Sequence, residues 1–224
     1  EAVFIKISKA DKLAISIVGP MKGAKVVEGE SAVEDKLAFI VSSFVFDGSK
    51  NTPYKVDDQT NPINVYGATK LAGELAIKAH CPTNSAIVRT SWVYSSHGNN
   101  FVKTMLRLMA EKDELNVVSD QIGCPTNATG LAKYLWQLAE QEALEPIYHY
   151  SDLGVASWYD FAVAIQHCAF EQGILNKKIP IMPIPSLAYP TPAKRPVFSL
   201  MQQSDSAASV HWHTRLKNMI ASFV

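Results

Sequence analysis

The sequence has few cysteines and no excess of charge of either sign. Its cysteines are odd in number and far apart, with no Cys-x-x-Cys pair: Cys81, Cys124 and Cys168. This spacing argues against structural zinc and favours reduced, packed thiols in a cytoplasmic protein. Basic and acidic residues both number 21. We therefore expect neither nucleic acid nor an anionic membrane as the main partner.

Long apolar runs are missing as well. The longest ones, such as residues 37–41, are far shorter than the roughly 20 residues that a spanning helix requires. No secretory signal is visible at the start. We expect a cytoplasmic location and no membrane partner.

A glycine-rich turn for binding a dinucleotide is the third feature that is missing. A strand is expected over residues 13–18, but the glycines after it fall at positions 19, 23 and 29, and Pro20 lacks a backbone donor. A dinucleotide-binding turn would show G-x-G-x-x-G or a near variant leading into a helix. We interpret residues 19–23 as an ordinary turn, with a phosphate cradle as the alternative, and residues 31–36 as a short helical turn.

The rest of the chain alternates between apolar runs and amphipathic segments. The patterns predict strands over 37–46, 85–94, 115–118 and 147–150, and helices over 66–79, 99–112, 129–142, 157–173 and 214–223. Such alternation indicates an α/β fold built from parallel βαβ units. Six of the 12 prolines fall between Pro180 and Pro196, too densely for central strands, which favours a small substrate-side lobe.

One stretch brings together residue types that can perform acid catalysis. Tyr66 and Lys70 lie four residues apart in Asn64-Val65-Tyr66-Gly67-Ala68-Thr69-Lys70-Leu71-Ala72-Gly73-Glu74, so they share one face of the helix that Asn64 is expected to cap. A nearby positive charge lowers the pKa of a tyrosine from about 10. Such an acid can protonate a carbonyl oxygen while hydride arrives at its carbon. Because chance alone produces roughly 0.6 Tyr-x-x-x-Lys pairs in this composition, the context must decide.

Two serines lie toward the carboxyl end of the strand expected over 37–46. Ser42 and Ser43 precede the turn signal Asp47-Gly48. In open α/β sheets this edge binds ligands. Turn chemistry is the alternative for two serines at a strand end.

Further motifs follow in a fixed order. Besides the Asn64–Glu74 stretch they are Ser42-Ser43-Phe44-Val45-Phe46-Asp47-Gly48, Arg89-Thr90-Ser91-Trp92-Val93-Tyr94, Asn99-Asn100-Phe101, Asp120-Gln121-Ile122-Gly123-Cys124-Pro125-Thr126 and Tyr189-Pro190-Thr191-Pro192-Ala193-Lys194-Arg195-Pro196. From about residue 37 to the C-terminus the sequence resembles the dTDP-4-dehydrorhamnose reductase family of extended short-chain dehydrogenases/reductases. The resemblance implies a Rossmann-like doubly wound parallel sheet. It also implies reduction of the 4-keto group of dTDP-4-dehydro-L-rhamnose to dTDP-L-rhamnose by NADPH or NADH.

The resemblance assigns roles to the matching residues. Tyr66 would protonate the carbonyl oxygen, and Lys70 would lower the pKa of Tyr66 and hydrogen-bond the nicotinamide ribose. Ser42 would orient the carbonyl, with Ser43 beside it. Trp92 would contact the deoxysugar nucleotide, although core packing is its alternative.

Two further positions and the partners are implied more weakly. Thr126 and Arg195 lie in family motifs near the substrate, and a solvated charge is the alternative for Arg195. Family members can dimerise with a bound magnesium, so a homodimer is an open expectation. The magnesium ligands do not map onto this sequence, and no metal-binding residue is assigned.

The chain departs from the family in two places. Ser42-Ser43-Phe44 stands where the family usually has Thr-Asp-Tyr, so the hydroxyl is kept and the carboxylate is lost. The part before Ser42 is also short, because a single βαβ unit takes about 30 residues. Residues 1–145 are therefore predicted as a partial cofactor-binding domain, and 146–224 mainly as a substrate-binding lobe with some segments returning to the sheet. Either the sequence omits segments of a longer protein, or it cannot hold a dinucleotide in the family's way. The alternative function is that of a non-catalytic dinucleotide-binding or regulatory relative of the same fold.

Overall fold

The main sheet is parallel, as the alternation of strands and helices predicts. The computed structural model describes residues 3–5, 13–17, 36–83, 85–204 and 210–223. The sheet has the strand order β1-β2-β3-β4-β9, formed by Val3–Ile5, Leu13–Ile17, Lys36–Ser42, Ser85–Thr90 and Ile147–His149. Only β1 runs antiparallel to its neighbour. The carboxyl ends of β3 and β4 therefore lie at one edge of the sheet.

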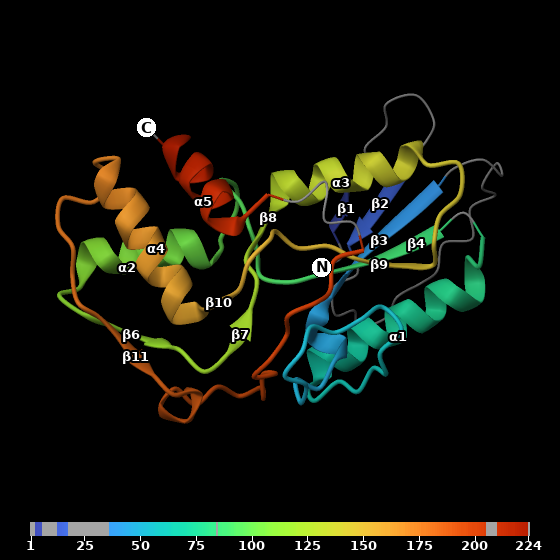
Figure 1. Ribbon diagram of the computed structural model, residues 1–224, viewed down its shortest axis with the longest axis horizontal. Coiled ribbons are helices and arrows are strands. Elements are labelled where there is room, and N and C mark those ends of the chain that lie inside the picture. The colour runs from blue at the N-terminus through green and yellow to red at the C-terminus, as the bar shows by residue number, and fades with distance from the viewer. Residues whose placement is uncertain (1–2, 6–12, 18–35, 84, 205–209, 224) are drawn as a thin grey trace.

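Helices cover both faces of this sheet. Helix α1 (Val65–His80) and helix α3 (Ala128–Glu140) lie on opposite sides of it (Figure 1). The side chains of β3 pack against both helices: Val41 lies in one apolar cluster with Ile77 of α1, and Ala38 lies in another with Leu135 of α3. Because successive side chains of a strand point to opposite faces, the unbroken apolar run of β3 is buried on both. We call the sheet with α1 and α3 the sheet lobe.

A second apolar cluster forms beside the sheet lobe. It is built around α2 (Phe101–Glu111), α4 (Trp158–Glu171) and α5 (Trp212–Ala221), which gather away from the main sheet in Figure 1. With them lie the parallel pair β6 (Leu115–Val118) and β11 (Ile181–Ile184) and the antiparallel pair β7 (Ile122–Gly123) and β10 (Ala156–Ser157). We call these elements the second lobe.

The chain crosses between the lobes more than once. β5 (Val93–Tyr94) pairs with β8 (Thr126–Asn127) between them. Helix α2 and strand β6 precede residue 145 and pack in the second lobe, whereas β9 follows it and lies in the main sheet. The domain division at 145/146 stays a prediction.

Two of the predicted strands are shorter in the structure. The strand expected over 37–46 ends at Ser42, and residues Ser43–Val45 form the 3₁₀ helix η1. The Ser42 hydroxyl accepts a hydrogen bond from the Phe44 amide at 3.2 Å, so serine chemistry at the strand end starts the turn. The strand expected over 85–94 breaks at Ser91-Trp92, where Trp92 has a φ of 46°.

Helix ends follow the capping signals of the sequence. Asn64 caps α1 through a bond from the Gly67 amide at 2.7 Å, and Ser157 and Asp160 form a capping box at α4. Pro183 lies in β11, which pairs only with β6 among the described strands, as expected for a proline-containing edge strand. The turn expected over 19–23 and residues 31–35 lie outside the described residues.

Within the described part of the chain, none of the helices combines the length and the apolarity needed to cross a bilayer.

Candidate active site

A cavity of about 350 Å³ lies between the carboxyl edge of the sheet and the second lobe. It is lined by Ser42, Ser43, Phe44, Asn64, Tyr66, Trp92, Trp158, Ala193 and Arg195. Five of the seven residues predicted for the site are among them, whereas Lys70 and Thr126 are not. The structure therefore brings Tyr66 and Ser42 into the same cavity.

A close contact between α1 and η1 sets the position of Tyr66. A Cβ atom added to Gly67 would lie 2.1 Å from the Phe44 carbonyl oxygen, so only glycine permits this approach. The Tyr66 ring meets the Phe44 ring edge to face, with centroids 5.9 Å apart. The phenol thus lies beside the end of β3, where Ser42 is.

The pKa of Tyr66 departs from the expected direction. Partial burial raises it, and a hydrogen bond from the Ser42 side chain opposes that rise. The expected lowering by Lys70 is not the dominant influence, because removal of the phenol from water disfavours the phenolate. At neutral pH Tyr66 therefore carries its proton, the form that a proton donor needs.

Lys70 lies one helical turn further along α1 and is almost completely buried. Its side chain is 4% exposed, and its ammonium lies 5.4 Å from the centroid of the Tyr66 ring. Burial lowers the pKa of Lys70. Among the described residues it makes no ion pair, which leaves its charge available to the phenol or a ligand.

Trp92 forms a wall of the cavity together with Trp158, a residue that the sequence patterns did not single out. Their rings are stacked with centroids 3.7 Å apart. Trp92 holds a left-handed backbone conformation, which costs a non-glycine residue about 1–2 kcal/mol. A Cβ atom at Gly123 would lie 2.8 Å from the Trp92 ring. The only sequence signal for Trp158 is its place just after the Ser157 cap.

Arg195 reaches the cavity from the proline-rich segment. Gly48, with a φ of 80°, lets Pro196 approach so closely that a Cβ atom would lie 2.7 Å from the proline. Asn64 donates a hydrogen bond to the Lys194 carbonyl at 2.8 Å, so the cap of α1 also holds this segment. Asn64 was predicted only as a cap.

A second cavity of about 1020 Å³ adjoins the second lobe. It shares Trp158, Ala193 and Arg195 with the first. Residues of α2, of β6 and of the segment 186–195, which begins with the 3₁₀ helix η2 (Ser186–Ala188), line the rest. A ligand longer than a monosaccharide could therefore extend from the first cavity into this groove.

Thr126 lines neither cavity, and its side chain is fully buried; its contact with substrate stays a prediction. Its amide donates to the Trp92 carbonyl at 3.1 Å, so it supports the cavity wall from behind. Ser43 is also fully buried and lines the cavity, and its hydroxyl has no hydrogen-bond partner among the described residues.

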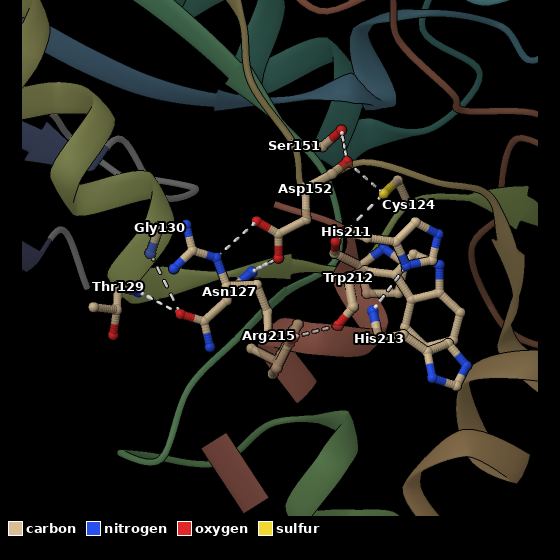
Figure 2. A network of polar contacts seen from close by, with 12 residues as sticks. Cys124, Asn127, Thr129, Gly130, Ser151, Asp152, His211, Trp212, His213 and Arg215 are labelled. Atoms are coloured by element: carbon tan, nitrogen blue, oxygen red, sulfur yellow. Dashed lines mark hydrogen bonds and ion pairs between the residues drawn. The ribbon is translucent and has the colours of Figure 1, made fainter. Parts of the chain in front are cut away.

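A polar network joins the lobes, and Figure 2 shows most of it. The Ser91 hydroxyl donates to the Cys124 carbonyl, and the Cys124 thiol donates to the Asp152 carbonyl, both at 2.8 Å. The Asp152 carboxylate accepts from the Asn127 amide at 2.9 Å and lies 3.8 Å from Arg215 of α5. Burial raises the pKa of Asp152 to about 6.

The described residues fit the nicotinamide end of a dinucleotide. Tyr66 and Lys70 lie near the carboxyl edge of a parallel sheet, where such cofactors bind. The glycines of residues 18–35 lie outside the described part, so the interpretation of that turn stays a prediction. In the described part no group of three or more His, Cys, Asp or Glu residues is placed to hold a metal.

A parallel sheet covered by helices, with the Tyr66–Lys70 pair facing a serine at the end of a strand, defines an α/β protein of the Rossmann-like, short-chain dehydrogenase/reductase type. The family model described as the RmlD substrate binding domain matches residues 9–224. The chain belongs to this family.

Individual relatives agree with this family. The dTDP-4-dehydrorhamnose reductase of Shigella flexneri is 41% identical over 191 residues, which cover 80% of this chain and 62% of the relative. That of Sinorhizobium fredii is 45% identical over 164 residues, covering 70% and 54%. The chain thus spans less than two thirds of the length of these curated relatives.

Solved structures agree as well. The dTDP-4-dehydrorhamnose reductase of Bacillus anthracis in complex with NADP has a TM-score of 0.77 at 35% identity, over 84% of this chain and 66% of that one. An orthologue from Clostridium acetobutylicum has a TM-score of 0.77 at 36% identity, with the same coverage. These matches confirm the predicted fold class.

Proposed function

We propose that this chain reduces the 4-keto group of dTDP-4-dehydro-L-rhamnose to give dTDP-L-rhamnose, with NADPH or NADH as the hydride donor. The observation that carries the proposal is the meeting of the Tyr66 phenol and the Ser42 hydroxyl in one cavity. Membership of the RmlD family and the names of the relatives support the same activity.

The side chains divide the work as follows. When bound, the nicotinamide supplies the hydride. The Ser42 hydroxyl donates a hydrogen bond to the substrate carbonyl, and Tyr66 gives its proton to the oxygen as negative charge develops there. The Lys70 ammonium stabilises the phenolate that remains and is placed for a ribose hydroxyl.

The two cavities would hold the two parts of the substrate. We place the sugar in the smaller cavity, against Trp92 and with Ser43 beside the ring, and the nucleotide in the larger groove. Arg195 lines both cavities, where its guanidinium can pair with phosphate oxygens.

The experiment that tests the proposal is the substitution Tyr66→Phe, which removes the proton donor and keeps the ring. Turnover of dTDP-4-dehydrorhamnose with NADPH should fall by about 10²–10⁴-fold, the usual contribution of a positioned acid. Tyr159→Phe is the matched control, because Tyr159 lines neither cavity. Equal turnover by Tyr66→Phe and the parent would contradict the mechanism.

The second candidate is a dinucleotide-binding or regulatory protein without catalysis. One observation favours it: Ser43 stands where the family usually has a carboxylate. Tight binding of NADPH without reduction of any keto-sugar would support this alternative.

We also propose a cytoplasmic location and a homodimer. The three thiols are free, as expected in a reducing compartment. Sedimentation of the purified chain with and without magnesium tests the dimer and the metal together.

A further inference from the structure

A buried ion pair lies beneath the helix that carries Tyr66 and Lys70. Arg89 of β4 donates to both carboxylate oxygens of Glu74 of α1, from Nε at 2.8 Å and from Nη2 at 2.7 Å. The two side chains are only 3% and 1% exposed. Burying two charges requires almost as much free energy as their attraction returns, so stability alone does not explain this pair.

The Nη1 group of Arg89 also has partners. Its Nη1 donates to the Val56 carbonyl at 3.2 Å and lies 3.4 Å from His149 Nε2. Its guanidinium lies 5.0 Å from the centroid of the Phe46 ring. Arg89 therefore has one fixed orientation, and it holds Glu74 in one as well.

A second cation, Lys70, precedes Glu74 by four residues in α1. This spacing puts the two side chains on the same face of the helix, and both are buried. Without Arg89, the spacing would let the buried carboxylate turn to the Lys70 ammonium. The structure instead pairs Glu74 with Arg89 and leaves Lys70 without an ion pair in the described part of the chain.

We propose that Arg89 is a positioning residue of the candidate active site: by holding both oxygens of Glu74 it keeps that carboxylate away from Lys70, whose ammonium stays free to act on Tyr66 and on a cofactor. The register supports this, because Arg89 lies beside Val41 in the sheet, one residue before Ser42. The inference rests on the proposed function, in which Tyr66 is the acid.

Few charged groups face Tyr66 and Lys70. From α1 these are their own side chains and Glu74; from β4 it is Arg89, with the neutral imidazole of His149 of β9 behind it. Arg195 shares the cavity of Tyr66. The end of β3 and η1 present the hydroxyls of Ser42 and Ser43.

The test compares two substitutions that break the same ion pair. Arg89→Gln releases the Glu74 carboxylate toward Lys70, whereas Glu74→Gln removes that carboxylate. The readout is the titration of the Lys70 ammonium, followed by NMR of isotope-labelled lysine, with Lys70→Met to assign the signal. This readout needs no turnover, so the inference can fail while the proposed function stands, and the reverse.

We expect Arg89→Gln to raise the titration midpoint of Lys70 by about one pH unit, because a carboxylate beside the ammonium favours its charged form, and to weaken NADPH binding. Glu74→Gln and the double variant Glu74→Gln/Arg89→Gln should stay near the parent midpoint. The matched control is Arg107→Gln, which removes an exposed ion pair with Glu111 and should change nothing. If Arg89→Gln does not fold, Arg89→Lys, which makes a single contact in place of the fork, should shift the midpoint the same way by less.

Two outcomes would overturn the inference. One is an equal effect of Arg89→Gln and Glu74→Gln, which is what a merely structural ion pair predicts. The other is an unchanged Lys70 midpoint in a folded Arg89 variant.

Discussion

At the scale of single residues, burial controls the charge states more than ion pairs do. Tyr66, Lys70, His149 and Asp152 all have pKa values moved mainly by removal from water. Burial favours the neutral form of each group. Tyr66 therefore holds its proton for transfer, and a rise in pH through its raised pKa should reduce the rate of carbonyl reduction.

His149 and Asp152 should affect stability in opposite directions over the same pH range. Burial lowers the pKa of His149 to about 4 and raises that of Asp152 to about 6. As the pH falls from about 6.5, the pKa of an unfolded histidine, to about 4, the unfolded chain binds a proton at His149 and the folded chain does not. The free energy of unfolding therefore decreases over this range. As the pH falls from about 6 to about 4, the pKa of an unfolded aspartate, the folded chain binds a proton at Asp152 before the unfolded chain does. This proton uptake increases the free energy of unfolding.

The substitution Asp152→Asn should expose the His149 effect. The amide oxygen can still accept from the Asn127 amide, but no proton is taken up. Between pH 7 and pH 4.5 the free energy of unfolding of this variant should fall by about 2 kcal/mol more than that of the parent. Urea unfolding at the two pH values measures this, and parallel curves for parent and variant would contradict it.

At the scale of elements, α1 is held against the sheet at two points. Gly67 contacts the Phe44 carbonyl at the start of the helix, and Glu74 binds Arg89 two turns later. The first contact sets the height of Tyr66 over Ser42, and the second sets which face of the helix is buried.

The substitution Gly67→Ala tests whether the close approach of α1 to η1 matters more for stability than the intrinsic helix propensity of residue 67. Alanine favours a helix by about 1 kcal/mol over glycine, but its Cβ would clash with backbone at 2.1 Å, which η1 cannot avoid by rotating a side chain. We expect a net loss of stability of about 1–3 kcal/mol and at least tenfold lower turnover. Ala76→Gly, at an exposed position of the same helix, is the control; it should lose about 1 kcal/mol and keep full turnover.

At the scale of the whole molecule, the candidate site depends on both lobes. β3, η1 and α1 supply Ser42, Phe44 and Tyr66, whereas Trp158 and Arg195 come from α4 and the proline-rich segment. The Ser91–Cys124 contact and the Asp152–Arg215 contact tie the lobes together, and Figure 2 shows the second of them.

A dTDP-sugar that fills both cavities should therefore stabilise both lobes. With dTDP-L-rhamnose at about 100 times its dissociation constant, the gain is about 2.7 kcal/mol, or roughly 2–4 °C in Tm for a chain of this size. Hydrogen exchange should slow both in η1 and at the start of α4. Protection confined to one lobe would argue against a shared site.

Local pattern was sufficient to predict the α/β class, most helices with their caps, and the Tyr66–Lys70 pair, because these depend on residues a few positions apart. Tertiary packing decided the rest. Trp158 contacts Trp92, and Arg89 contacts Glu74, although the residues of each pair are too far apart in the sequence for a helix or strand pattern to predict the contact. Packing also decided that the pKa of Tyr66 is raised. Burial depends on every element that covers the phenol, whereas the Tyr66–Lys70 spacing indicates only one neighbouring side chain.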